Sequence, residues 1–432
     1  MKNQRILIIF TVVSLLLMIG SILYQTLQDR DPYRFYTGLG QEFDIAPDDS
    51  QFAFSYFLDG REAIYMSNLD GSNVTRLSEK IEGRSRSPKF SHDGEELLFL
   101  TEDDQGIQTI TVMNHDGSDA NRLTLDGLHV TDAVFAYDNE TIFFTAMLAS
   151  EVGKLEGETK EGYDLYQVDR QSGQIRQLTD KDHFSMNNLS ISTDGETLYY
   201  SLFESNEQPV AYSLEKKTET PVAQVNGDMY SSVFSEDGSL LAYTAVTEQS
   251  KNSSLFHYEL FVKNVESNKV KQLTDLQANV QSPVFLHKTD HIAFLQYKNW
   301  PDEPGYFQLM SVSLKGNVKP KLIELDLPVS SETYFIPKTI EVLLSAQAIA
   351  VYYVLFFVGL ILVAKRRSGK VYLPSLISLA LSVLTFVASF VVGFLTNPWY
   401  GIGLSIVAIT MFVCSIFLII ISFIIKKFIG KS

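Results

Sequence analysis

The sequence contains a single cysteine, Cys414, which lies in an apolar run near the end of the 432-residue chain. One thiol cannot form an intramolecular disulfide, and the polar part of the chain has neither a thiolate nucleophile nor a cysteine-ligated zinc site. We therefore expect the polar part to be stabilised by packing alone.

Acidic residues are absent from both ends of the chain. All 51 acidic residues lie between Asp29 and Glu341, while residues 1–28 and 342–432 hold 9 of the 35 basic residues. Residues 30–340 contain 26 basic and 49 acidic residues, a net charge of −23. Such a surface repels phosphate backbones, so we expect no nucleic-acid partner. An acidic middle between apolar, basic-tipped ends is typical of a membrane protein with a soluble insert.

Four runs without any charged residue are long enough to span a bilayer, at 6–24, 342–364, 371–395 and 401–425. A helix needs about 20 residues to cross the hydrocarbon core. The first run could instead be a cleavable signal sequence, but its length favours a retained anchor. No Asp, Glu, Lys, Arg or His lies inside the later spans, which argues against a transporter or pump.

The basic residues beside these spans predict the topology. They are Lys2 and Arg5, then Lys365, Arg366, Arg367 and Lys370, and finally Lys426, Lys427 and Lys431. All three clusters fall on one side if four helices cross, and basic residues favour the cytoplasmic side. We therefore predict a multi-pass protein of the cell membrane with both termini cytoplasmic, and with residues 41–328 outside the cytoplasm.

Residues 41–328 consist of six related segments with a period of roughly 45–55 residues. Each segment divides into four short apolar, β-branched or aromatic stretches separated by turn residues, with Asp-Gly turns at 93–94, 194–195 and 237–238. Four-stranded units that cannot bury their faces alone are typical of a β-propeller. The predicted fold class is all-β, a six-bladed β-propeller, with one N-terminal and three C-terminal transmembrane helices. A single antiparallel sandwich is the alternative.

Several short motifs make these segments specific. They are Ser87-Pro88, Phe90-Ser91, Asp93-Gly94, Ile64-Tyr65-Met66, Asp70-Gly71-Ser72-Asn73, Leu123-Thr124, Leu178-Thr179 and Leu273-Thr274. In these motifs the chain resembles the TolB-type, WD-like propeller repeat over about two thirds of its length. The resemblance implies a six-bladed extracytoplasmic domain that binds other proteins, although a propeller fold also supports enzymes. The membrane ends do not match the soluble members, so their partners are not carried over.

Motifs of catalysis and metal binding are missing. The sequence has no Gly-x-Ser-x-Gly, no Gly-x-x-x-x-Gly-Lys and no His-Glu-x-x-His. His287 and His291 have the spacing of a helical metal pair, but they flank a turn position of the repeat, so we interpret them as turn residues. We expect no catalytic residue, no cofactor and no metal, and thus a protein that is not an enzyme. A propeller enzyme with unrecognised acid–base pairs is the alternative.

The expected organisation has linkers at 29–40 and 329–341, on either side of the propeller. We predict a membrane-anchored scaffold or receptor that binds a protein or a cell-envelope component. The alternative is an accessory or sensory subunit of another membrane complex, engaged through the C-terminal helices. Small residues there permit close helix contact, namely Gly359, Gly393, Gly401, Gly403 and Ser405. The oligomeric state is left open.

Three insertions, at 147–162, 247–257 and 296–306, each fall between the second and third strands of a segment. In an antiparallel blade these loops share one face with the blade-to-blade connections, and we expect both linkers to leave from that face. Binding residues concentrate in exposed loops on a rigid scaffold. Tyr297, Trp300 and Tyr306 are the predicted partner-binding residues, because aromatic side chains dominate interfaces. The alternative is that Trp300 covers its own blade.

Overall fold

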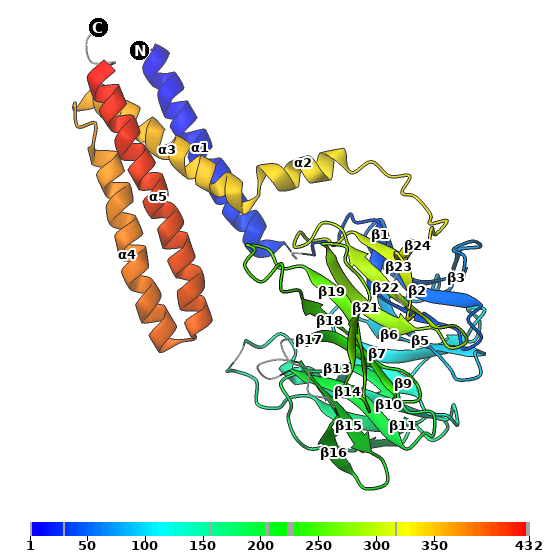
Figure 1. Ribbon diagram of the computed structural model, residues 1–432. Coiled ribbons are helices and arrows are strands. Elements are labelled where there is room, and N and C mark those ends of the chain that lie inside the picture. Colours follow the sequence, from blue (N-terminus) through cyan, green and yellow to red (C-terminus); the bar gives the residue numbers. More distant parts are fainter. Residues whose placement is uncertain are drawn as a thin grey trace. The chain divides into compact units, whose positions relative to one another are not determined.

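A computed structural model describes residues 2–28, 31–125, 127–155, 157–203, 207–222, 229–315 and 318–428. The chain divides into two compact units. One consists of Met1–Asp31 together with Thr333–Ser432 and is helical, and the other is Pro32–Glu332 and is built of strands (Figure 1). Each unit is described by itself below.

The strand unit is built of consecutive antiparallel meanders, in which each strand pairs with the next along the chain. The first sheet holds β1 (Gly38–Ile45), β2 (Gln51–Leu58), β3 (Arg61–Asn68) and β4 (Thr75–Arg76). The second holds β5 (Arg84–Phe90), β6 (Glu96–Glu102), β7 (Gln108–Asn114) and β8 (Asn121–Arg122). The third holds β9 (Leu128–Phe135), β10 (Thr141–Leu148), β11 (Asp164–Asp169) and β12 (Ile175–Gln177), with the short 3₁₀ helix η1 (Ala149–Glu151) after β10.

The fourth sheet holds β13 (Met186–Ile191), β14 (Thr197–Phe203), β15 (Glu207–Ser213) and β16 (Thr218–Pro221). The fifth sheet has eight strands. It begins with β17 (Met229–Phe234), β18 (Leu240–Val246), β19 (Tyr258–Asn264) and β20 (Val270–Gln272). It continues with β21 (Asn279–Phe285), β22 (His291–Tyr297), β23 (Phe307–Ser313) and β24 (Lys321–Leu322). One parallel pair, Tyr258 and Asn279, joins these two meanders.

The middle strands are apolar on both faces because each sheet is covered on both sides by its neighbours. In β2 every residue from Phe52 to Phe57 is buried. The hairpin turns follow the predicted chemistry: Gly94 has φ +77°, a conformation that other residues reach only with strain. The Asp93 carboxylate in the same turn accepts the backbone N–H of Glu95 at 3.0 Å.

The first and last meanders pack against each other through side chains. Phe54 and Tyr65 of the first sheet share one buried cluster with Leu295 and Leu309 of the last meander. After β24 the chain runs back over the first sheet, where the Asp326 N–H donates to the carbonyl of Gly71 at 3.1 Å. Among the described strands, no backbone pairing joins the first sheet to the last.

The first strand of each meander contains an irregular register. In β5, β13, β17 and β21 the irregularity places a residue other than glycine at positive φ, at Ser87, Asn188, Ser231 and Ser282. A bulge of this kind bends the strand and redirects a side chain. These first strands line one cavity of about 530 Å³, described below.

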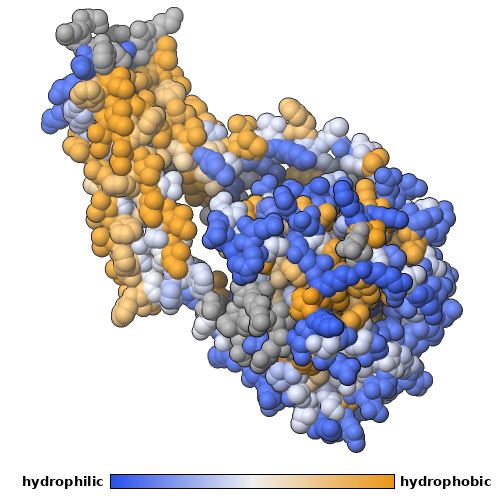
Figure 2. Space-filling model, in the orientation of Figure 1, coloured by the Kyte–Doolittle hydropathy of each residue, from blue (hydrophilic) through white to orange (hydrophobic). Residues whose placement is uncertain are grey.

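The helical unit contains α1 (Lys2–Leu27), α2 (Phe335–Leu343), α3 (Ala346–Arg367), α4 (Leu373–Leu395) and α5 (Pro398–Phe428). Four helical segments are long and apolar enough to cross a membrane, at Gln4–Leu27, Ala346–Arg367, Leu373–Leu395 and Pro398–Lys427. Hydrophobic residues dominate the surface of this unit, whereas the strand unit is mostly hydrophilic (Figure 2). Residues 329–341, expected to be a linker, include most of α2.

Small residues let α4 and α5 approach closely. A Cβ on Gly401 would lie 2.7 Å from the Cα of Gly393, so a larger residue would force the helices apart. Serine hydroxyls extend the contact, with Ser378 Oγ 2.6 Å from Ser415 Oγ. Of the predicted contact residues, Gly403 is open, since an added Cβ would meet nothing within 4 Å, and Ser405 is not buried.

The basic clusters gather at one end of the helical unit. The Lys426 ammonium at the end of α5 lies 5.1 Å from the ring centroid of Tyr372 in the α3–α4 connection. The start of α1 lies at the same end (Figure 1). This arrangement agrees with the one that charge counting requires of a four-span protein.

Candidate binding surface

One face of the strand unit carries both the loops between second and third strands and the blade-to-blade connections. In the third sheet, the Ala149 N–H donates to the carbonyl of Gly127 at 2.8 Å, and the Gly162 N–H donates to Asp182 Oδ1 at 3.0 Å. Both ends of the 147–162 insertion therefore lie beside blade-to-blade connections. We call this the loop face.

Both ends of the strand unit also lie on the loop face. At the N-terminal end, Tyr33 stacks on Phe57 with ring centroids 4.7 Å apart, and the Gly60 N–H donates to the carbonyl of Tyr36 at 2.8 Å. At the C-terminal end, the Ser330 hydroxyl hydrogen-bonds the carboxylate of Asp59. All these contacts surround the turn between β2 and β3.

The loop of residues 298–306 between β22 and β23 is held by its own hydrogen bonds. The Tyr306 N–H donates to Asn299 Oδ1 at 2.6 Å, and Asn299 Nδ2 donates to the carbonyl of Pro304 at 3.1 Å. The Tyr36 hydroxyl donates to the carbonyl of Gly305 at 2.5 Å, which ties the loop to the start of the unit. Because these hydrogen bonds hold the loop in one conformation, little conformational entropy is lost when its side chains bind a partner.

The three predicted binding residues differ in exposure. Tyr297 is only 7% exposed, and its hydroxyl donates to the carbonyl of Asp302 at 2.7 Å, so it supports the loop from within. Trp300 is 37% exposed and Tyr306 is 51% exposed. The Trp300 ring meets the edges of Tyr297 and Tyr258, with centroids 5.4 and 6.3 Å apart. Since Tyr258 directly follows the 247–257 insertion, two of the three insertions adjoin at Trp300.

A cavity of about 530 Å³ runs between the first strands of the meanders. At the level of the irregular registers, a ring of polar residues lines this cavity, one from each meander: Glu42, Ser87, Asp132, Asn188, Ser231 and Ser282. Sequence reasoning missed this ring. Its signal is a polar residue at the same place in every repeat, which becomes visible only when the six segments are superposed.

Lys89 is a basic residue that lines this cavity. Burial disfavours its charge, but the carboxylates of Asp44 and Asp132 outweigh that effect and raise the pKa of Lys89. Burial raises the pKa of Asp132 to about 6, although Lys89 opposes the shift. Carboxylates here also join neighbouring meanders, because Asp132 accepts the Leu189 N–H at 2.7 Å and Asp44 accepts the Phe90 N–H at 2.8 Å. These contacts hold the unit together.

Two histidines occupy the same repeat position at one mouth of the cavity and make the same contact. His92 Nε2 lies 3.2 Å from the carbonyl of Phe135, and His287 Nε2 lies 3.2 Å from the carbonyl of Ile45. In each case the acceptor belongs to the next meander. His287 also pairs with the Glu236 carboxylate through Nδ1. Both imidazoles thus act as structural bridges.

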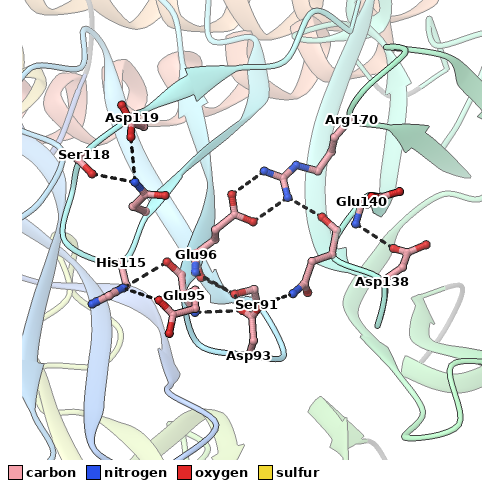
Figure 3. A network of polar contacts seen from close by, with 12 residues as sticks. Ser91, Asp93, Glu95, Glu96, His115, Ser118, Asp119, Asp138, Glu140 and Arg170 are labelled. Atoms are coloured by element: carbon pink, nitrogen blue, oxygen red, sulfur yellow. Dashed lines mark hydrogen bonds and ion pairs between the residues drawn. The ribbon is translucent and has the colours of Figure 1, made fainter.

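A second polar network joins the second and third sheets (Figure 3). The Arg170 guanidinium donates to both carboxylate oxygens of Glu96 at 2.7 Å, and Asn139 Nδ2 donates to Asp93 Oδ2 at 2.7 Å. These charges are satisfied internally, so the network stabilises the contact between sheets. Within the described part of the chain, no group of three or more His, Cys, Asp or Glu residues could hold a metal ion.

Comparison with known proteins identifies the fold. No protein-family model and no curated protein matches this sequence. Among solved structures, TolB from Acinetobacter baumannii matches with a TM-score of 0.50 and 15% identity, over 63% of this chain and 63% of that chain. This chain thus spans less than two thirds of that TolB.

Two further structures match less closely. A protein described as TolB from Agrobacterium tumefaciens has a TM-score of 0.46 and 14% identity, over 58% of this chain and 84% of its own. An oligogalacturonate lyase from Vibrio parahaemolyticus has a TM-score of 0.47 and 12% identity, over 64% of this chain and 91% of its own. The strand unit is a β-propeller. It is TolB-like, and it is joined to four apolar helices.

One expectation from the sequence is wrong. We expected a protein that is not an enzyme, because the usual hydrolase, phosphate-loop and metal motifs are missing. The structures that match this chain include the oligogalacturonate lyase, which is an enzyme. Missing motifs therefore do not exclude catalysis here, because a propeller can assemble a site from residues scattered over several meanders, which no short motif records.

Proposed function

We propose that the propeller unit lies outside the cytoplasm and binds a protein or another cell-envelope component through the loop face. Trp300 and Tyr306 are the proposed contact residues, and Tyr297 is their buried support. The observation that carries the proposal is the exposed aromatic pair on a loop fixed at both ends by hydrogen bonds. Rigid aromatic side chains supply contact area at low entropic cost.

The proposal includes the finer points of architecture and topology. Each half of the eight-stranded sheet is a four-stranded meander joined to the other by one residue pair, so we count six blades. We place both termini and the Lys365–Lys370 connection in the cytoplasm, on the positive-inside argument. The bilayer and an envelope partner are then the proposed interaction partners.

Photocrosslinking on intact cells tests the binding face. A photoreactive amino acid at Trp300 or Tyr306 is expected to capture a partner. The control position is Asp116, an exposed residue in the turn between β7 and β8, on the opposite face. Equal or stronger capture of the same partner from Asp116 would defeat the proposal. Identification of the captured species distinguishes a protein from a cell-wall component.

A second candidate is an accessory or sensory subunit that contacts another membrane protein through α5. The observation that favours it is the open surface at Gly403, where an added Cβ would meet nothing within 4 Å. Copurification after mild detergent extraction separates the two proposals. A Gly403→Leu substitution is expected to remove a partner bound through α5 and to leave a partner of the loop face in place.

A further inference from the structure

Helix α2, Phe335–Leu343, is a short helix with none of its residues buried. Its apolar side chains are among the most exposed of the helical unit, with Phe335 at 78%, Ile336 at 69% and Leu343 at 53%. Apolar residues at such exposure need a cover other than water. The helix carries one basic and one acidic residue, Lys338 and Glu341.

Three apolar residues of α2 lie opposite its charged residues, while Phe335 and Val342, three and four residues from Lys338, lie between the two sides. Ile336, Ile340 and Leu343 follow one another at spacings of four and three residues, which places them on one face of a helix. Lys338 and Glu341 are three residues apart and lie on the other face. Pro337 falls in the first turn, where its missing N–H costs no helical hydrogen bond.

Hydrogen bonds fix the C-terminal end of α2 beside the end of α1 and the start of α3. Gln25 Nε2, in the last turn of α1, donates to the carbonyl of Leu344 at 2.8 Å. Ser345 breaks the helix and caps α3, accepting the Ala348 N–H at 3.2 Å, and the Tyr352 hydroxyl donates to the carbonyl of Leu343 at 2.9 Å. Figure 1 shows α2 turning away from the axis of α3 at this point.

We propose that α2 lies in the interface between the lipid headgroups and acyl chains, with Ile336, Ile340 and Leu343 directed into the membrane and Lys338 and Glu341 toward water. Nine residues extend only about 14 Å, less than half of the hydrocarbon thickness, so α2 cannot span. A helix with one apolar face at the boundary of a spanning segment is stabilised in that interface.

The charges of α2 predict how its membrane binding depends on lipid charge. Lys338 and Glu341 cancel, so the helix has no net charge to attract anionic headgroups. Binding then depends on apolar burial alone. We expect the same depth in vesicles of phosphatidylcholine and in vesicles that also contain phosphatidylglycerol.

Site-specific fluorescence in the full-length protein tests this inference. Cys414→Ser removes the native thiol, and single cysteines at Ile340 or at its neighbour Glu341 carry an environment-sensitive dye. After reconstitution, lipids with a quencher on the acyl chain are expected to quench the dye at Ile340 several-fold more than at Glu341. The pair Ile336 and Lys338 is expected to repeat this pattern, which guards against a local effect of one label.

Two results would overturn the inference. Equal quenching at the apolar and charged positions would show that α2 has no face in the lipid. Protection of Ile340 from both the lipid quencher and an aqueous quencher would show that protein covers it, either the same chain or a second copy. A depth that increases when phosphatidylglycerol is added would contradict the argument that apolar burial alone holds the helix.

Discussion

His287 is expected to hold the last meander both to the first and to the preceding one, and replacing His287 or its partner Glu236 tests this. Its imidazole contacts Glu236 of the preceding meander and the carbonyl of Ile45 in the first one. The backbone N–H of His287 donates to Asp49 Oδ1 at 2.7 Å. No backbone pairing among the described strands joins the first meander to the last, so side chains such as His287 carry that contact. Glu236→Gln removes the charge while keeping an acceptor, and His287→Ala removes both side-chain contacts.

The expected losses are small but measurable. His287 is mostly buried and Glu236 is about half exposed, so solvent screens the pair and it contributes about 1 kcal/mol. The Nε2–carbonyl bond adds about 1 kcal/mol. A unit of this size changes Tm by about 1.5 °C per kcal/mol, because the entropy of unfolding grows with chain length. Scanning fluorimetry is expected to show losses of about 1–2 °C for Glu236→Gln and about 3 °C for His287→Ala.

The loss is expected to depend on pH with a defined sign. Burial opposes the charge of His287, but Glu236 outweighs it and raises the pKa of the imidazole above its ordinary 6.5. This stabilisation is complete below pH 6.5 and is lost as pH rises through the raised pKa. The hydrogen bond from His287 lowers the pKa of Glu236 below its ordinary 4.5, so its contribution is lost only as pH falls through that lowered value. The pair therefore stabilises most between pH 4.5 and 6.5.

His92 is the matched control because it makes the equivalent carbonyl contact without a carboxylate partner. Burial lowers the pKa of His92, so the folded state favours the neutral imidazole and loses stability as pH falls. The Tm loss of Glu236→Gln is expected to be larger near pH 6 than near pH 9, and the loss of His92→Gln is expected to show the opposite trend. Equal losses of Glu236→Gln at both pH values would refute the ion pair.

Three further predictions concern turns, sheet contacts and topology. Gly94→Val is expected to destabilise by about 2 kcal/mol because its φ is +77°, whereas Gly94→Asn costs less, and similar melting points for the two variants would contradict this. Arg170→Met is expected to cost about 1–2 kcal/mol in chemical denaturation because it leaves the Glu96 carboxylate unpaired; no change in the midpoint would show that this bridge is not formed. In intact cells, a cysteine at Ser368 is expected to resist an impermeant thiol reagent, and its labelling from outside would reverse the topology.

The sequence allowed most of the local structure to be predicted, because local structure depends on residues close together in the chain. Alternation of apolar residues located the strands, Asp-Gly pairs located the hairpins, and uncharged runs located the four long apolar helices. Residues 329–341 were predicted as a linker, and no helix was predicted there; most of α2 lies in these residues. The helix has only nine residues, and the long apolar run that follows it in the sequence makes its own periodicity hard to recognise.

The binding site could be predicted only in part. The position of the 298–306 loop follows from the length of the insertion, but the exposure of its aromatic residues does not. Tyr297 and Tyr306 lie near the two ends of the same insertion, and the packed structure shows that the first is buried and the second is open. The partial burial of Trp300 could not be predicted either, because one of the rings that it contacts, Tyr258, belongs to another meander.

The repeat, the turns and the four long apolar helices could be predicted from the sequence, since each depends on spacing within about 50 residues. Which side chains meet across meanders is set by the tertiary fold. The polar ring of the central cavity, the bridges made by His92 and His287, and the contact between first and last meanders join residues far apart in the chain; His287 and Ile45 are 242 positions apart. Such pairs leave no local pattern, because each partner only has to fit a surface that forms when the meanders pack together.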